Sequence, residues 1–282
     1  MALLSLEDAR KLAPVFNGKG GAILYKALCR ITSLDALSKV YEDNSMHEGK
    51  EFATHTLQYL KTDYQIGNYD RLLHLPEGPF ITIANHPYGG VDGLILVDMF
   101  GTFRSDYKVM VNKLLGHLKA FSPSFITVTP TGNEKSAPTR ESLQGVRLSM
   151  QHVRDGHPLG IFPSGAVSDL SLKEMSIRDR QWQESVVKII KKLRVPIVPV
   201  RFFDRNSLYY YALGLIDWKV RLTRLCREGI NKGGKRVRVA IGEILDVEAQ
   251  DRIADIGEFT AFLRESVYGM PLPDKFVKRS EI

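Results

Sequence analysis

Two residues in this 282-residue sequence have the types and spacing expected of an acid–base pair: His86 and Asp92, in the run N-H-P-Y-G-G-V-D-G at 85–93. A neutral imidazole takes a proton from a hydroxyl or amine, and a neighbouring carboxylate fixes its tautomer and stabilises the imidazolium. This is the base half of a catalytic triad, with the nucleophile left to the substrate. A histidine bonded to backbone, followed by an aspartate that caps a helix, is the alternative. The pair alone does not separate these interpretations.

The elements around this run are predicted from hydrophobic periodicity. An apolar strand at 80–84 precedes it and an apolar helix at 94–100 follows, while Pro87, Gly89 and Gly90 prevent a regular helix between them. Strands alternating with helices predict an α/β fold, with a mostly parallel mixed sheet flanked by helices and functional residues where strands end. Further strands are predicted at 107–111, 125–128, 159–162, 196–203 and 237–241, and further helices at 113–121, 139–154 and 181–193.

The domain organisation follows from the same periodicity. Apolar residues at helical spacing, such as Ile23, Leu24, Leu28 and Ile31, predict an N-terminal helical subdomain at 1–75. The α/β domain is expected at 76–270, with a C-terminal tail at 271–282. A hydrophobic content of 44% suits one large core or two modest ones, and Pro and Gly without a period exclude collagen and repeat architectures.

The two cysteines, Cys29 and Cys226, have no Cys or His at metal-ligand spacing, so we expect free thiols in a reducing compartment and no metal site. Residues 1–19 lack the pattern of a secretory signal. The longest apolar run, 208–216, has 9 residues, whereas a membrane-spanning helix needs about 20. Any membrane contact is therefore predicted to be peripheral.

The positive charge is concentrated in one part of the chain. The net charge is +7, and residues 188–238 contain 14 Lys and Arg against 3 Asp and Glu. These cations alternate with Trp218, the tyrosines at 209–211 and several leucines. Such a pattern suits an anionic lipid surface, where each basic residue contributes roughly 1 kcal/mol. Nucleic acid would also be attracted, and a solvated basic surface without a partner is the remaining alternative.

Two further segments carry polar residues at the ends of predicted strands. The apolar segment at 195–200, V-P-I-V-P-V, contains two prolines that favour an edge strand, and Arg205 and Asn206 follow it. The run F-P-S-G-A-V-S follows the strand predicted at 159–162, and its backbone N–H groups and hydroxyls suit an anionic head group or phosphate. The candidate binding residues in this turn are Phe162, Pro163, Ser164 and Gly165.

In their order and spacing, these segments resemble the four sequence blocks of the lysophospholipid and glycerolipid acyltransferases, over about 80–200. The likeness looks closest to a bacterial, hemolysin-like branch that includes acyltransferases of ornithine and glycine lipids. Within that branch, the tail from Arg205 to Lys232 extends the likeness to about residue 244. Several blocks in order are far more specific than any single motif.

The resemblance implies that a fatty acyl group moves from a thioester of acyl carrier protein or coenzyme A to a hydroxyl or amine of a lipid acceptor, without a bound cofactor. His86 matches the catalytic base and Asp92 its partner. Lys113 lies where the second block supplies basic contacts, and Ser164 and Gly165 lie in the acceptor block. A tetrahedral oxyanion also requires donors, for which the Gly89 and Gly90 N–H groups are candidates. The remaining candidate binding residues are Asn85, Phe162, Pro163, Arg205 and Asn206.

The sequence also departs from the family pattern. Five residues separate His86 from Asp92 where the family has four, so the loop is predicted to bulge. The third block lacks a Glu beside Gly165, and the second has V-T-P at 128–130 where the family has an Arg. Because phosphate recognition uses such an Arg, an aminolipid acceptor is favoured over lysophosphatidic acid.

These features together predict an O-acyltransferase that acts on a lyso-lipid or N-acyl amino acid at the cytoplasmic face of the inner membrane. Nucleic acid is not an expected partner, whereas the basic segment suits an acidic acyl carrier protein as well as an anionic membrane. The alternatives are a lysophosphatidic acid acyltransferase, hydrolysis of a thioester or lyso-lipid, and a noncatalytic basic protein that binds membranes.

Overall fold

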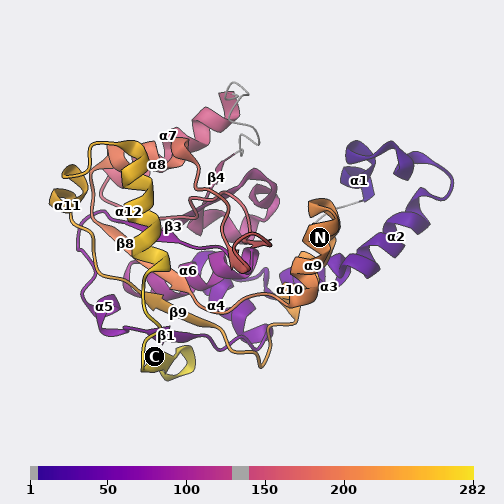
Figure 1. The fold of residues 1–282 in the computed structure, drawn as a ribbon. Coiled ribbons are helices and arrows are strands. Elements are labelled where there is room, and N and C mark those ends of the chain that lie inside the picture. The colour runs from indigo at the N-terminus through magenta and orange to yellow at the C-terminus, as the bar shows by residue number, and fades with distance from the viewer. Residues whose placement is uncertain (1–5, 129–139) are drawn as a thin grey trace.

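The computed structural model describes residues 6–128 and 140–282, and within them eight strands form one sheet in the order β10-β1-β9-β8-β2-β5-β3-β4 (Figure 1). Neighbouring strands are parallel except in the pairs β8–β9 and β1–β10. The predicted α/β fold with a mostly parallel mixed sheet is therefore confirmed. The strands are β1 Gln65–Gly67, β2 Ile81–Ala84, β3 Lys108–Asn112, β4 Phe125–Val128, β5 Leu159–Ile161, β8 Ile197–Phe202, β9 Arg238–Ile241 and β10 Phe276–Lys278, and a separate hairpin pairs β6 Asp169–Ser171 with β7 Ser176–Arg178.

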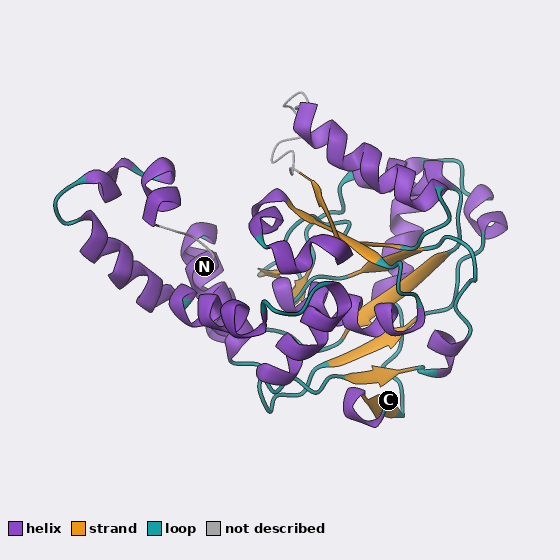
Figure 2. Ribbon diagram, turned by 180° about the vertical axis from the view of Figure 1, so that it is seen from behind, coloured by secondary structure: helices purple, strands orange, loops and turns teal. Residues whose placement is uncertain are grey.

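Helices cover both faces of the sheet (Figure 2). Strand residues alternate between the faces, so Phe80 and Ala84 pack into a core with α4 and α6, whereas Ile81 and Ile83 pack into a second core with α8 and α12. The helices are α1 Leu6–Leu12, α2 Gly21–Thr32, α3 Leu34–Asn44, α4 Gly49–Tyr59, α5 Asp70–Leu73, α6 Gly90–Phe103, α7 Arg140–Arg154, α8 Glu184–Leu193, α9 Leu208–Ile216, α10 Trp218–Ile230, α11 Val247–Asp251 and α12 Ile256–Tyr268.

Helix α6 is the central helix of the first core. Its residues from Val91 to Phe100 are all buried, as expected of a helix that is apolar on every side. The helix predicted at 94–100 lies inside it, but α6 begins earlier, at Gly90. Asp92 is consequently the third residue of the helix, where its carboxylate faces the backbone of the preceding turn.

Two expectations about local structure are wrong. The helix expected at 113–121 is instead two 3-10 helices, Lys113–His117 and Lys119–Ser124, because Gly116 and Pro123 weaken a continuous α-helix. The strand with two prolines is β8, which lies between β2 and β9 rather than at an edge. Pro199 lies between the Ile197–Leu245 bridge and the first residue pair of β8 with β9, Val200 with Ile241. Proline is tolerated there because no strand hydrogen bond needs its N–H at that point.

The other predicted strands and helices occur within a few residues of their expected bounds. Helix α7 begins at Arg140, and Thr139, Thr129 and Pro130 lie outside the described residues. Strands β1 and β10 were not predicted, since three residues are too few to show a period, and both belong to the large sheet. The domain boundaries at 75 and 270 stay a prediction.

A group of helices extends from the α/β body, and we call α2, α3, α9 and α10 the helical arm (Figures 1 and 2). Helix α10 packs against the other three. The arm exposes large apolar side chains, which are Ile23, Leu24, Leu28 and Ile31 on α2, Leu208, Tyr209, Leu215 and Ile216 on α9, and Trp218, Val220 and Leu222 on α10. Within 6–128 and 140–282, every helix is too short or too polar to cross a bilayer.

The C-terminal residues are tied to α6 through a buried carboxylate. Asp98 is 1% exposed, and Arg279 donates to its two oxygens at 2.6 and 3.2 Å. Tyr64, just before β1, donates to the same carboxylate at 2.7 Å. A buried carboxylate is costly without a cation, so Arg279 holds the end of the chain against the helix that carries Asp92.

Replacing Arg279 with Ala should lower the free energy of unfolding by about 2 kcal/mol or more, because Asp98 would stay buried without its guanidinium. Arg252→Ala is the matched control, since Arg252 and Glu248 form an exposed pair on one helix face, worth roughly 0.5 kcal/mol or less. Urea unfolding of both variants measures the difference, and equal small losses would contradict the role given to Arg279.

Candidate active site

The candidate site lies where three neighbouring strands of the sheet end. Strands β8, β2 and β5 are parallel neighbours, and their carboxyl ends lead into segments 203–207, 85–89 and 162–168. Parallel strands bring such segments to one edge of the sheet, which is the usual place for a site in an open α/β fold. The predicted site residues after these strands are thus neighbours in space although they are far apart in the sequence.

His86 and Asp92 face each other across the loop at 85–92. The distance from His86 Nδ1 to Asp92 Oδ2 is 2.9 Å, which is a hydrogen-bond distance, although the ring is turned away from the ideal angle. Such misalignment is common before substrate binds. The same Oδ2 accepts hydrogen bonds from the backbone N–H groups of Tyr88 at 2.8 Å and Gly89 at 3.0 Å. One carboxylate oxygen therefore holds both the imidazole and the turn that leads into α6.

Burial raises the pKa of the Asp92 carboxyl above its ordinary value, because this side chain is fully buried. The contact with His86 and the two backbone donors oppose that rise. The Asp92 carboxylate has no permanently charged partner among these contacts. A proton on the imidazole of His86 would give it a cationic partner. This arrangement suits a histidine that becomes an imidazolium during a reaction.

The backbone of His86 is held from both sides by residues of a later segment. Its N–H donates to Asp179 Oδ1 at 3.1 Å, and its carbonyl accepts from the Ser168 N–H at 2.9 Å. Asp179 is itself buried and accepts from the Ser168 hydroxyl and the Trp182 indole. Sequence reasoning missed Asp179, which lies 93 positions after His86 and belongs to no local motif.

Two asparagines that we predicted to bind substrate instead contact the backbone around the loop. Asn85 exchanges two hydrogen bonds with the backbone of Phe202, at 2.9 and 2.7 Å, and so joins the end of β2 to β8. Asn206 donates to the Pro87 carbonyl at 3.0 Å, and the Tyr211 hydroxyl donates to the same oxygen at 3.2 Å. In this structure both asparagines support the loop, and their contact with substrate stays a prediction.

A cavity of about 420 Å³ opens beside His86. The ring centroid of Phe162 lies 4.1 Å from that of His86 and forms part of the wall. Of the other predicted residues, Gly89, Gly90 and Gly165 also line the cavity. The rest of its lining is mostly apolar and includes Leu37, Tyr41, Phe52, Leu94, Leu115 and Phe125. Its size is within the roughly 300–1,000 Å³ of small-molecule sites.

The remaining predicted binding residues do not converge on His86. The hydroxyl of Ser164 donates to the Ala166 carbonyl at 2.8 Å, within its own turn, and the Pro163 carbonyl accepts from the Gln183 N–H. Lys113 is exposed and follows Asn112, which lines the cavity, and Arg205 is exposed at the end of β8. The roles of these residues in binding stay predictions.

The candidate oxyanion donors are also separated by the structure. The Gly89 N–H already donates a hydrogen bond to Asp92, so it is not available to an oxyanion. Gly90 is the first residue of α6, where a backbone N–H has no partner inside the helix, and it is exposed beside the cavity. Of the two glycines, Gly90 is therefore the one whose N–H is placed to meet a developing negative charge.

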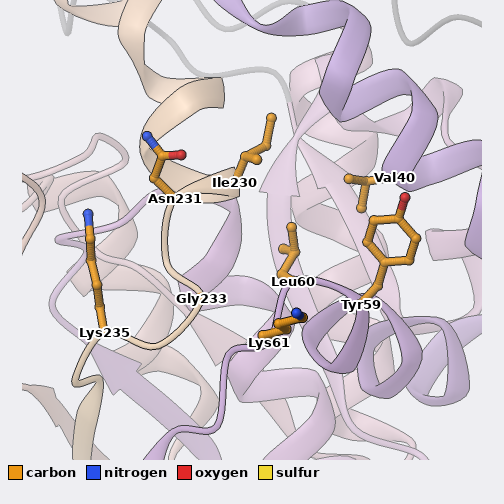
Figure 3. Close-up of a pocket in the computed structure, with 8 residues that line it drawn as sticks. All are labelled: Val40, Tyr59, Leu60, Lys61, Ile230, Asn231, Gly233 and Lys235. Carbon is orange, nitrogen blue, oxygen red and sulfur yellow. The ribbon is translucent and has the colours of Figure 1, made fainter.

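A second hollow, of about 490 Å³, lies between the end of α4 and the loop after α10 (Figure 3). Its eight lining residues include none of the predicted site residues. Its cations, Lys61 and Lys235, have no acid–base partner among those eight residues. The cavity beside His86 is therefore the candidate site.

Comparison with known proteins adds a family and two relatives. Residues 25–272 match the model of a family described as "Acyltransferase". The chain is 26% identical over 250 residues to a lyso-glycine lipid O-acyltransferase from Phocaeicola vulgatus, covering 86% of this chain and 85% of that protein. It is 24% identical over 250 residues to a lyso-glycine lipid O-acyltransferase from Bacteroides thetaiotaomicron, covering 86% and 87%.

The two glycines of the loop should respond differently to alanine. Gly89 has φ +82° and ψ −129°, and an added Cβ would lie 3.1 Å from Leu225, so Gly89→Ala should lower the free energy of unfolding by about 1–3 kcal/mol. Gly90→Ala is the matched control, because its Cβ would meet no atom within 4 Å. Thermal unfolding compares them, and a Gly89→Ala protein as stable as Gly90→Ala would contradict this account of the turn.

Proposed function

This chain belongs to the acyltransferase family, and on that premise we propose that it transfers a fatty acyl group from a thioester donor to the hydroxyl of a lyso-glycine lipid. His86 is the general base and Asp92 its partner. The observation that carries this proposal is the 2.9 Å contact between the imidazole and a buried carboxylate at the mouth of an apolar cavity.

In the proposed reaction, the acceptor hydroxyl gives its proton to His86 Nε2 while its oxygen attacks the thioester carbonyl. Nε2 is the available atom because Nδ1 is buried against Asp92. The tetrahedral intermediate then collapses, the carbon–sulfur bond breaks, and the imidazolium returns the proton to the leaving thiolate. Asp92 stabilises the imidazolium between these two steps, and the Gly90 N–H faces the oxyanion.

The apolar cavity is the proposed site for the acyl chain of the donor. Its walls come from α3, α4, α6 and the segment after β3, so a chain lying in it would be enclosed by the first core. A thioester at its mouth would lie beside His86 and Gly90, which line it together. The donor is proposed to be acyl carrier protein or coenzyme A, which supply the same thioester carbonyl.

The acceptor class rests on the names of the two relatives and on the chain's own departures from the phosphate-binding pattern. The second block has no Arg where phosphate recognition would use one. A glycine lipid presents a carboxylate and an amide instead of a phosphate. We therefore propose the hydroxyl of a lyso-glycine lipid rather than lysophosphatidic acid.

Replacing His86 with Ala should lower kcat for acyl transfer on the order of 10²–10⁴-fold, because the general base is lost. The measurement follows a labelled acyl group from acyl carrier protein or coenzyme A onto lyso-glycine lipid. His74→Ala is the control, since His74 is exposed and contacts a backbone carbonyl of its own helix. Undiminished transfer by His86→Ala would overturn the mechanism, and preference for lysophosphatidic acid would overturn the acceptor.

We further propose that the helical arm binds the anionic cytoplasmic face of the inner membrane. The arm exposes apolar side chains on α2, α9 and α10. It also carries exposed cations, among them Lys26, Arg30, Lys219 and Arg227. Apolar residues flanked by cations are the pattern of a helix that lies in the interface of an anionic bilayer. Leu225 and Cys226 of α10 line the cavity, so an arm on the membrane would place the site close to its lipid acceptor.

The double variant Ile23→Ser with Ile31→Ser should bind vesicles containing anionic lipid at least about tenfold more weakly, because both side chains are about three-quarters exposed and available to the bilayer. The control is Leu73→Ser, an exposed leucine on α5, away from the arm (Figure 1). Cosedimentation at low and high salt measures binding. The proposal would be contradicted if binding did not change with salt concentration, with anionic lipid content or with the Ile23→Ser and Ile31→Ser substitutions.

A further inference from the structure

Lys232 is a buried cation that the proposed reaction does not use. The residue is 2% exposed, and its ammonium donates to Asn206 Oδ1 at 2.6 Å. Its Nζ atom also lies 4.1 Å from the ring centroid of Tyr88. Burial lowers the pKa of Lys232 to about 8, although the charge of Glu228 opposes this change. A buried ammonium is costly, so its contacts must compensate for the lost hydration.

The contacts of Lys232 lead directly to the loop at 85–92. Asn206 accepts from Lys232 with its carbonyl oxygen and donates with its amide nitrogen to the Pro87 carbonyl at 3.0 Å. The ammonium thereby fixes which way the Asn206 amide points, since the opposite orientation would set N–H against N–H. Pro87 is bonded to His86 and precedes Tyr88, whose N–H donates to Asp92.

Glu228 holds the neighbouring residue in the same manner. It is 2% exposed, lies four residues before Lys232, and accepts from the Ser207 N–H at 3.0 Å and the Ser207 hydroxyl at 2.6 Å. Asn206 and Ser207 are therefore each held by one buried charge. The segment that carries the Asn206 amide is fixed at two successive residues, which limits its freedom to move away from Pro87.

A second buried charge of α10, besides Glu228, contacts the other side of the loop. Arg221 is 3% exposed, pairs with Asp169, and donates to the Ser168 carbonyl at 3.0 Å. The Ser168 N–H in turn donates to the His86 carbonyl. Helix α10 and the residues just after it thus reach the loop from two directions through buried charges.

We propose that Lys232 is a positioning residue for acyl transfer, acting through Asn206 on the Pro87 carbonyl to hold His86 against Asp92. This inference rests on the proposed function for its kinetic consequence. Its structural part concerns the loop at 85–92 alone and is measurable without substrate. A displacement of the imidazole of about 1 Å is enough to lower a rate on the order of a hundredfold.

The test compares Lys232→Met, which keeps the length of the side chain and removes the charge, with Lys235→Met. Lys235 lies in the same loop after α10 and is exposed. We expect Lys232→Met to lower kcat on the order of tenfold to a hundredfold, with the KM of both substrates within about twofold. The control should change neither constant. A kcat for Lys232→Met that matches the control would overturn the proposal.

Hydrogen exchange supplies a readout that does not depend on activity. The amides of Tyr88 and Gly89 are bonded to Asp92, and they should exchange faster in Lys232→Met while those of the central strands β2 and β8 do not. Unchanged exchange at these two amides would overturn the proposal. If His86→Ala transferred acyl groups at an undiminished rate, the mechanism in the proposed function would fail, and this exchange result would still decide the role of Lys232.

A second variant tests the route and serves if Lys232→Met unfolds. Asn206→Asp keeps an acceptor for Lys232 but removes the donor to the Pro87 carbonyl, so it should reproduce the loss of kcat and the faster exchange. The double variant should lose no more than the more damaged single variant, because both changes break one path. A kcat loss in the double variant equal to the product of the two single losses would show that Lys232 does not act through Asn206. An unchanged kcat for Asn206→Asp would show the same.

Discussion

The site depends on a carboxylate that is buried without a permanent cation. Helix α6 carries two buried aspartates, and the one at residue 98 is neutralised by Arg279. Asp92 is paired instead with an imidazole and two backbone N–H groups at the start of the helix, where the helix dipole favours negative charge. These contacts lower the pKa of the Asp92 carboxyl and so oppose the rise that burial causes. The core that buries α6 thus holds the Asp92 carboxylate in a fixed position beside the imidazole of His86.

The sequence predicted two parts of the site, the loop at 85–93 and the turn at 162–165, and two residues of that turn line the cavity. The strand before His86, the loop and the helix after it are consecutive, so periodicity and the positions of glycine and proline place them. The residues that hold the loop from outside come from remote segments: Asp179 and Asn206 lie 93 and 119 positions from the backbone groups they contact. Their types are ordinary, and no spacing reveals which asparagine or aspartate reaches the loop. Only the fold of the sheet, which aligns the ends of β2, β5 and β8, brings them together.

The basic segment at 188–238 illustrates the limit of counting charges along a sequence. Several of its cations are used inside the protein: Arg221 and Lys232 are buried, and Arg238 forms a pair with Asp204. Arg201 donates to backbone carbonyls near the end of α12. A linear count adds these to cations such as Lys219 and Arg227, which are exposed. The segment at 188–238 therefore has fewer exposed cations than the count suggests, and the exposed apolar side chains of the helical arm gain importance for any contact with a membrane.

The loop between His86 and Asp92 is held by contacts from several remote segments. The loop turns at Gly89, whose backbone conformation is open to glycine and strained for other residues. The turn directs Tyr88 inward, where it is 1% exposed, packs edge-on against Phe202 and meets Lys232. A longer loop has more freedom, and ordering it costs more conformational entropy. The buried charges on and just after α10 compensate for that freedom by fixing Pro87 and Tyr88, so the loop and its supports form one structural unit.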